Sequence, residues 1–230
     1  MELSVNQQSS SINTIKELQT RREENDEKLA SGKRINDAAD DPAGLQIASR
    51  LTAQVNQNQQ LSTNAQDQIN YNTVQEGGLS AINDSLQRAN ELAVSAGNPL
   101  NDSSAIQSEL NEITEQVNTL ASDVLGNASF LPTLDATDPA AAQDAITAAL
   151  DTVTQEAAAL GASNSGLSSQ VSTYNTTVVN VSESRSRIQD TDFAEASTTQ
   201  AQQNVLLQSA ILTKKDDEDA RKGLLINQVV

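Results

Sequence analysis

The sequence predicts an all-α protein built as an elongated rod of long coiled-coil-like helices, and three observations support this. Apolar side chains over residues 146–188 recur at intervals of three, four and seven, the heptad period that keeps one helix face against a partner helix. The 230 residues include two Phe, two Tyr and no Trp, a composition suited to thin helix-on-helix packing. Nine Gly and four Pro leave few places for a helix to break. The stripe consists of Ile146, Leu150, Val153, Ala157, Leu160, Leu167, Val171, Tyr174, Val178, Val181 and Ile188.

The first helix is expected over residues 5–30, where a thin apolar stripe runs between charged faces. Such a helix is marginal alone and requires a partner. Its stripe includes the first set of expected assembly residues: Ile12, Ile15, Leu18 and Leu29. Ser31-Gly32 is a plausible stop, and Asp40-Asp41-Pro42 is a strong helix start because acidic caps precede a proline in the first turn.

The second helix is expected over residues 42–96, with Gly77-Gly78 as a soft point because each glycine weakens a helix. A turn at residues 97–99 leads to a third helix with a strict apolar stripe from Ile106 to Val124. Residues 127–137 then contain the one place where a short hairpin could form. The fourth helix, which carries the heptad stripe, starts near Pro139.

The final helix is expected from about Asp192. It contains the assembly candidates Val205, Leu206 and Ile211, followed by a run of mixed charge over residues 214–222 and the closing apolar residues Leu224, Leu225 and Ile226. A free chain end usually frays and favours polar residues. An apolar end that follows a charged run is therefore expected to be buried on assembly.

The net charge of −17 is unevenly distributed. Residues 61–184 hold fifteen acidic residues and one basic residue, Arg88, whereas residues 1–60 hold nine acidic and seven basic residues and residues 185–230 hold seven and six. Balanced charge suits surfaces that pack together, and charge of one sign suits a solvent-facing surface. The ends are thus expected to be buried against partners. The overall negative charge disfavours nucleic acid and anionic membranes as partners.

The absence of Cys and His excludes disulfides, thiolate metal sites and the Ser-His and Cys-His triads. An enzyme using only carboxylates would need acidic pairs on facing stripes, and the stripes of the third and fourth helices carry none. We therefore expect neither an enzyme nor a cofactor. No apolar run approaches the roughly 18 residues of a membrane span, and no cleaved secretory signal is expected.

Three strings resemble the conserved segments of bacterial flagellins. They are residues 29–45 (LASGKRINDAADDPAGL), residues 86–94 (LQRANELAV) and residues 184–193 (SRSRIQDTDF), in the order and at the distances typical of that family. The resemblance implies a structural subunit that self-assembles into the extracellular flagellar filament for motility. It also implies export without a cleaved signal peptide, and contacts with the flagellar cap, junction proteins and an export chaperone.

The same resemblance implies a domain plan. Residues 1–41 and 190–230 would pair as terminal helices of the inner tube, and residues 42–189 would form the long-helix bundle. Because only residues 127–137 separate the third and fourth helices, no separate outer domain is expected. Two other functions remain open: a hook-filament junction protein, or a secreted helical rod acting as an adhesin or receptor ligand, which would stay monomeric.

In flagellins, the Leu-Gln-Arg…Glu-Leu segment is the main contact for a Toll-like receptor. The matching residues here are Leu86, Gln87, Arg88 and Glu91, and Glu109 on the neighbouring helix supplies an acidic contact. Asn90 stands where the family commonly has Arg. A purely structural role is also open, since Leu86 lies on the core stripe and Arg88 could pair with Glu91 or Asp84.

The charged run at residues 214–222 departs from the family, whose C-terminal helix is usually uncharged. Two interpretations remain open. The run could form interhelical ion pairs with the similarly mixed residues 16–28, or it could be a solvated or bent stretch of helix.

Overall fold

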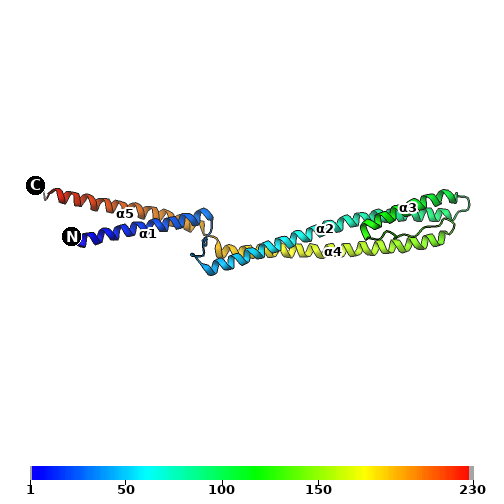
Figure 1. Ribbon diagram of the computed structural model, residues 1–230, viewed down its shortest axis with the longest axis horizontal. Coiled ribbons are helices and arrows are strands. Elements are labelled where there is room, and N and C mark those ends of the chain that lie inside the picture. Colours follow the sequence, from blue (N-terminus) through cyan, green and yellow to red (C-terminus); the bar gives the residue numbers. More distant parts are fainter. Residues whose placement is uncertain (1, 228–230) are drawn as a thin grey trace. The chain divides into compact units, whose positions relative to one another are not determined.

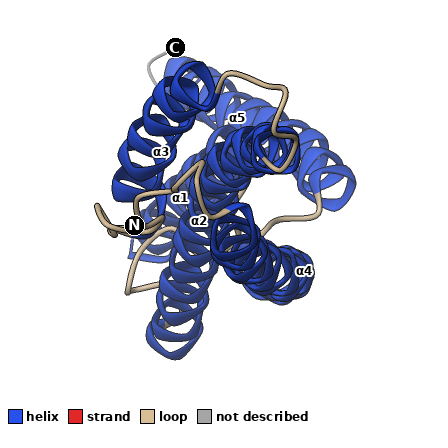
Figure 2. Ribbon diagram, turned by 90° about the vertical axis from the view of Figure 1, so that its right-hand side faces the viewer, coloured by secondary structure: helices blue, strands red, loops and turns tan. Residues whose placement is uncertain are grey.

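The computed structural model describes the backbone of residues 2–227 and the side chains of residues 12–216, 218 and 219. This part of the chain consists of helices and loops, with no strand (Figures 1 and 2). The helices are α1 (Glu2–Ser31), α2 (Pro42–Ala96), α3 (Ser103–Leu125), α4 (Pro139–Gln189) and α5 (Phe193–Asn227). The prediction of an all-α fold made of long helices is confirmed. None of the helices, over the described residues, has the length and apolar character needed to cross a membrane.

The chain divides into two compact units, each described here by itself. The terminal unit comprises Met1–Asn56 and Val178–Val230. The bundle unit comprises Gln57–Thr177. Helices α2 and α4 contribute residues to both units.

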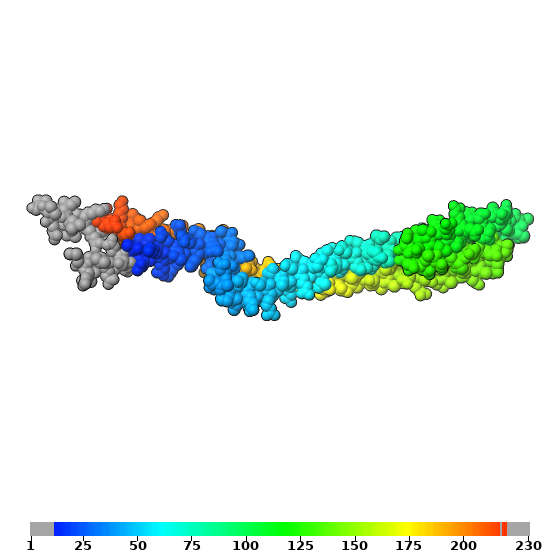
Figure 3. All heavy atoms as spheres, in the orientation of Figure 1, coloured from blue at the N-terminus to red at the C-terminus, as the bar shows by residue number. Residues whose placement is uncertain are grey.

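The bundle unit has its core where α3 packs against α2 and α4, which is its thicker, green part in Figure 3. The predicted α3 stripe and the first half of the heptad stripe are buried or half-buried there. The core residues from the three helices include Leu79, Ile82, Leu86, Ala89, Ala93, Ile106, Leu110, Ile113, Val117, Ala142, Ile146, Ala149 and Val153. Burial of each large aliphatic side chain contributes roughly 1.5–3 kcal/mol, so this region is the most stably packed part of the unit.

Farther along the bundle unit, α2 and α4 meet through polar side chains. The Asn72 Nδ2 group donates to Asn164 Oδ1 (2.8 Å), and Asn164 Nδ2 donates to Glu76 Oε1 (3.0 Å). Closer to the start of α2, Ser62 Oγ donates to Asn175 Oδ1 of α4 (3.1 Å). Asn72 and Ser62 are buried, whereas the heptad positions of α4 in this stretch are only half-buried. The α4 stripe therefore faces a partly polar partner here.

The hairpin that could form at residues 127–137 is absent, and these residues form a loop instead. The Asn118 side chain accepts a hydrogen bond from Leu131 N (2.8 Å) and donates one to Leu131 O (2.9 Å). The Gln107 side chain does the same for the next turn of the loop, accepting from Ala136 N (2.7 Å) and donating to Leu134 O (2.7 Å). Because a carboxamide carries a donor and an acceptor side by side, these two side chains replace the partner strand that buried backbone groups would otherwise need.

The connection between α3 and α4 is also anchored to the core of the bundle unit by its own side chains. Three of them are buried in the core of the bundle unit: Leu131, Leu134 and Ala136. The loop begins at Gly126, which ends α3 in the left-handed conformation with φ of 67°. Glycine reaches this conformation without the steric cost that a Cβ would bring.

The Gly77-Gly78 pair does not interrupt α2, which continues through it. A Cβ added at Gly78 would lie 2.3 Å from Val124 Cγ2, whereas one added at Gly77 would meet nothing within 4 Å. Gly78 therefore lets α3 approach α2 closely. Gly77 has no such packing role.

Candidate functional site

In the terminal unit, α1 and α5 lie side by side and run in opposite directions, so that Glu2 and Asn227 lie at the same end of the pair (Figure 1). Asn25 is buried between them and its Nδ2 group donates to Ala196 O (2.9 Å). One turn further, Gln200 donates from Nε2 to Asp26 Oδ1. These two bonds define which residues of α1 and α5 are level with each other.

The apolar residues expected to drive assembly fall into two groups. Those of α1, namely Ile12, Ile15, Leu18 and Leu29, are half-buried. On α5, Leu207 is buried, but Val205 is 65%, Leu206 54%, Ile211 48% and Leu212 61% exposed. The expected residues Leu224, Leu225 and Ile226 belong to α5, and their side chains lie outside the described residues. Helix α5 thus buries Leu207, whereas these four apolar side chains, which are spread around much of the helix, remain exposed within the described part of the chain; we call these four side chains the α5 face.

Two connections of the terminal unit bind each other, and we call them the clasp: residues 32–41 between α1 and α2, and residues 188–192 at the end of α4. Their main chains are joined by the bridge between Lys33 and Asp190 and by hydrogen bonds from Arg34 N to Gln189 O (2.7 Å) and from Thr191 N to Gly32 O (3.1 Å). The Arg34 guanidinium also donates from Nη2 to Ile188 O (2.7 Å). Gly32 has φ of 68°, which places it in the left-handed region that favours glycine.

Two side chains of the first connection, Asp40 and Ile35, stabilise the clasp. Asp40 Oδ2 accepts hydrogen bonds from Asn36 N (2.8 Å) and Asp37 N (3.1 Å), and these bonds hold the pKa of Asp40 below its ordinary value. Ile35 is 1% exposed. A Cβ at Gly44 would lie 2.6 Å from Ile35 Cδ1 and 2.4 Å from Asp41 Oδ2, so glycine at this position lets both side chains pack closely against the start of α2.

Sequence reasoning did not predict this clasp. Two of the strings singled out above, residues 29–45 and 184–193, are the segments that meet in it. The only signal in one sequence is that the first string interrupts a helix with Gly and Asp, and the second with Asp and Thr. Nothing in that pattern says that the two interruptions bind each other.

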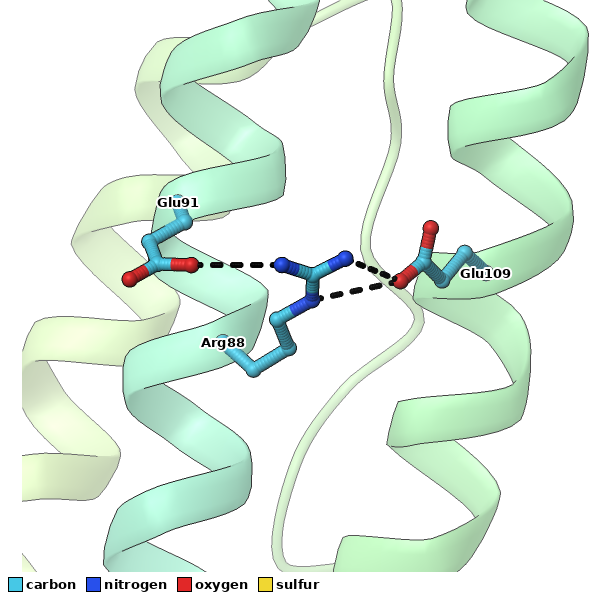
Figure 4. A network of polar contacts seen from close by, with 3 residues as sticks. All are labelled: Arg88, Glu91 and Glu109. Carbon is cyan, nitrogen blue, oxygen red and sulfur yellow. Dashed lines mark hydrogen bonds and ion pairs between the residues drawn. The ribbon is translucent and has the colours of Figure 1, made fainter.

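In the bundle unit, three of the expected receptor-contact residues form one polar cluster (Figure 4). The Arg88 guanidinium lies between two carboxylates, with Nη2 at 2.8 Å and Nε at 3.2 Å from Glu109 Oε1, and Nη1 at 3.4 Å from Glu91 Oε2. The hydrogen bonds to Glu109 raise the pKa of Arg88 above its ordinary value. Arg88 and Glu91 are exposed and Glu109 is half-buried, so the cluster lies at the surface of α2 and α3.

The other two expected receptor-contact residues behave differently from each other. Gln87 is exposed and donates from Nε2 to Asn83 Oδ1 (2.8 Å) on the same helix. Leu86 is fully buried in the core of the bundle unit. Its side chain does not belong to the exposed surface.

Among the described residues, no group of three or more His, Cys, Asp or Glu side chains converges as a metal site would require. What the geometry does provide is an uncovered apolar face on α5, a clasp between two connections, and a charged surface cluster on the bundle unit. The exposed apolar side chains and the charged surface cluster are features of protein-protein contact.

Comparison with known protein families explains why the three strings noted in the sequence, residues 29–45, 86–94 and 184–193, occur where they do. Residues 4–137 match the bacterial flagellin N-terminal helical region, and residues 143–214 match the bacterial flagellin C-terminal helical region. The chain belongs to the bacterial flagellin family. Flagellins are structural proteins rather than enzymes. Only residues 138–142 lie between the two matched regions, so this flagellin has no outer domain between its helical halves.

Individual flagellins show the same likeness over part of the chain. The chain is 45% identical over 98 residues to a flagellin of Clostridium tyrobutyricum, covering 41% of this chain and 26% of that protein. It is 46% identical over 94 residues to a flagellin and to the phase 2 flagellin of Salmonella typhimurium strain LT2, covering 41% of this chain and 19% of each. The aligned part is therefore about a quarter or less of these flagellins' length.

Proposed function

We propose that this flagellin is a structural subunit that self-assembles into the bacterial flagellar filament. The observation that supports this most directly is the α5 face, whose four side chains Val205, Leu206, Ile211 and Leu212 are about half exposed or more. A soluble monomer gains nothing from such a face, whereas a subunit of a polymer can cover it with a neighbouring copy.

The size of this face favours a polymer over a simple pair. Covering a fully exposed Leu, Ile or Val contributes roughly 1.5–3 kcal/mol, so covering these four half-exposed side chains contributes on the order of 3–6 kcal/mol. Association of two copies costs about 4–15 kcal/mol in lost freedom of motion. One such contact therefore does not hold two copies together, and each subunit needs several neighbours.

We further propose the domain plan and location expected from the sequence. Residues 1–41 and 190–230 would form the inner part of the filament and residues 42–189 the surrounding bundle. The filament would be extracellular, and the subunit would leave the cell without a cleaved signal peptide and meet the cap, junction proteins and an export chaperone. Mass spectrometry of the N-terminus of filament subunits tests the export route, since a cleaved leader would appear as a missing segment.

Assembly itself is tested by adding sulfate and filament seeds to purified protein and examining it by negative-stain electron microscopy. We expect uniform long filaments and a rise in helix content. Removal of residues 221–230 should abolish filaments while the bundle unit remains helical. Persistent monomers or short stacks from the intact chain would instead support a hook-filament junction protein or a monomeric adhesin.

A matched pair of variants tests the α5 face. The double variant Leu206→Ser with Leu212→Ser removes two exposed apolar side chains from α5 and should raise the concentration needed for assembly. The control Leu100→Ser removes an exposed leucine from the turn before α3, where no assembly contact is proposed. Equal assembly of the two proteins would contradict the role of the α5 face.

A second proposed function is recognition of the free subunit by a Toll-like receptor. The convergence of Arg88, Glu91 and Glu109 on one exposed surface supports it, together with Gln87 beside them. In a receptor reporter assay, we expect Arg88→Ala to reduce signalling and Asn90→Arg to increase it. Unchanged signalling from Arg88→Ala would place the contact elsewhere.

A further inference from the structure

We propose that the bundle unit contains a segment in which α2 and α4 separate and locally unwind while the three-helix core stays folded. We call it the opening segment and define it as residues 61–77 of α2 and 160–175 of α4, all of which lie within the bundle unit and are described. It is a conformational device of the single chain, so it goes beyond the proposed filament function and does not depend on it.

The opening segment begins where α3 ends. Gln75 Nε2 of α2 donates to Val124 O in the last turn of α3 (3.1 Å), which places the end of α3 level with Gln75. A hollow of about 350 Å³ lies at this end, lined by side chains that include Leu79, Phe130 and Leu160. Beyond it, α2 and α4 continue through the bundle unit as a pair without α3 (Figure 1).

Burial falls sharply in this segment. The α2 side chains that are buried in it are Ser62, Ala65 and Asn72, and every α4 side chain in it is half-buried or exposed. In the three-helix core, by contrast, Leu79 is 1% and Leu86 0% exposed. Because burial of apolar surface is the main force that holds helices together, the opening segment is held more weakly than the core.

A pair of asparagines replaces apolar side chains between the two helices. Asn164 fills the position that the heptad stripe of α4 skips between residues 160 and 167, and Asn72 lies seven residues before the buried Leu79 of α2. Asn72 is 3% exposed, and its bond to Asn164 continues from Asn164 Nδ2 to Glu76 Oε1. When this layer opens, its donors and acceptors bond to water instead, so separation costs less than exposing a layer of leucines would.

Three glycines lie near the level of the asparagine layer. A Cβ added at Gly77, Gly161 or Gly166 would meet nothing within 4 Å, so packing does not require glycine at these positions. Each glycine makes its helix less stable than alanine would. The same level of the bundle unit is thus weakened in two independent ways, between the helices by the polar layer and within them by the glycines.

Hydrogen exchange of the intact, unassembled chain, followed by mass spectrometry, tests the proposal. Backbone amides in both halves of the opening segment should exchange about tenfold faster, or more, than those of residues 79–93 and 106–121 in the core. Equal exchange in the two regions would overturn the proposal. Since the chain is measured before assembly, failure of the filament function would leave this result standing, and the reverse also holds.

Low concentrations of urea distinguish local opening from unfolding of the whole unit. Urea accelerates an opening in proportion to the surface that the opening exposes. Exchange of the core residues should therefore rise more steeply with urea than exchange of the opening segment. Parallel increases in the two regions would mean that the segment opens only when the whole unit unfolds, which would also overturn the proposal.

A pair of variants tests the asparagine layer as the cause. Asn72→Leu with Asn164→Leu makes the layer apolar and should slow exchange in the opening segment by about tenfold. The control Asn70→Leu with Gln170→Leu replaces exposed carboxamides on the same stretches of α2 and α4, and should leave the exchange nearly unchanged. Equal exchange in the two variants would overturn the role of the layer.

A third variant keeps the test valid if the leucine variant misfolds. Gly161→Ala with Gly166→Ala strengthens α4 and leaves the asparagine layer intact. It should slow exchange of residues 160–175 by about tenfold, while residues 106–121 exchange as in the unaltered chain. Unchanged exchange of residues 160–175 in this variant would contradict local unwinding of α4.

Discussion

Replacement of Leu86 by alanine distinguishes a core residue from a receptor contact. Leu86 lies in the string that resembles the receptor-binding segment of flagellins, yet it is 0% exposed and belongs to the same core cluster as Leu110 of α3 and Ile146 of α4. The change removes most of a buried side chain at the point where three helices meet. We therefore expect its main effect on folding stability.

The size of the expected loss of folding stability follows from the burial of Leu86. A buried leucine replaced by alanine loses the transfer free energy of the removed atoms and leaves a cavity, at a cost of about 2–5 kcal/mol. At about 2–4 °C per kcal/mol for a chain of this size, the melting temperature should fall by about 4–20 °C. The matched control is Leu100→Ala, because Leu100 is 91% exposed and should change stability by no more than about 0.5 kcal/mol.

The assay is thermal unfolding of both variants followed by circular dichroism, with receptor signalling measured at a temperature where each is folded. We expect Leu86→Ala to melt well below Leu100→Ala. Melting temperatures that agree within error would refute the assignment of Leu86 to the core. Normal stability together with lost signalling would make Leu86 a direct contact.

Three further predictions follow from single contacts. Gly78→Ala should destabilise the bundle unit by about 1–3 kcal/mol, because the new methyl group would overlap a valine of α3, whereas Gly77→Ala should stabilise it by about 0.5–1 kcal/mol in a urea titration. Asn118→Ala should cost about 1–3 kcal/mol and speed protease cleavage of the α3–α4 loop, while Gln116→Ala, an exposed change on the same helix, should do neither. Asp40→Asn should lower stability at pH 7 but lower it less at an acid pH below 3.8. The lowered pKa of Asp40 means that its carboxylate stabilises the fold fully above the unfolded value near 3.8, and this contribution is lost as the pH falls through the folded value. Equal differences between Asp40→Asn and the unaltered protein at both pH values would contradict this assignment.

The helix boundaries could be predicted because they depend on local chemistry. Asp41 precedes Pro42 and accepts a hydrogen bond from Gly44 N (2.9 Å), and Asp102 caps α3 in the same way. Asp192 accepts from Ala194 N (2.9 Å) at the start of α5. Each cap lies within three residues of its donor, so one stretch of sequence contains all the information.

The contacts that sequence reasoning missed join distant parts of the chain. The partners Arg34 and Gln189 of the clasp are 155 residues apart. The possible hairpin at residues 127–137 is absent for a related reason: Asn118 on the preceding helix already satisfies the loop backbone. A propensity scale describes what a segment favours and contains nothing about a side chain that arrives from elsewhere.

The two glycines of α2 illustrate the same limit. Identical residues at adjacent positions have the same propensity, so the sequence predicts one soft point. The structure separates them, because Gly78 faces Val124 of α3 and Gly77 faces open space. Only the packing partner distinguishes a glycine that is required from one that is merely tolerated.

Burial is distributed unevenly between the two units in a way that supports assembly. Of the largest fully buried side chains, those of the bundle unit include Leu79, Leu110 and Ile146, whereas the terminal unit contributes Ile35 in the clasp. The pairing of α1 with α5 beyond the clasp depends on half-buried apolar residues and a few polar bonds. A helix pair this thinly packed gains its remaining stability from neighbouring subunits. Loss of residues 221–230 should therefore remove filaments and leave the melting of the bundle unit unchanged, whereas a bundle that melts lower in the truncated protein would mean that the terminal helices stabilise it directly.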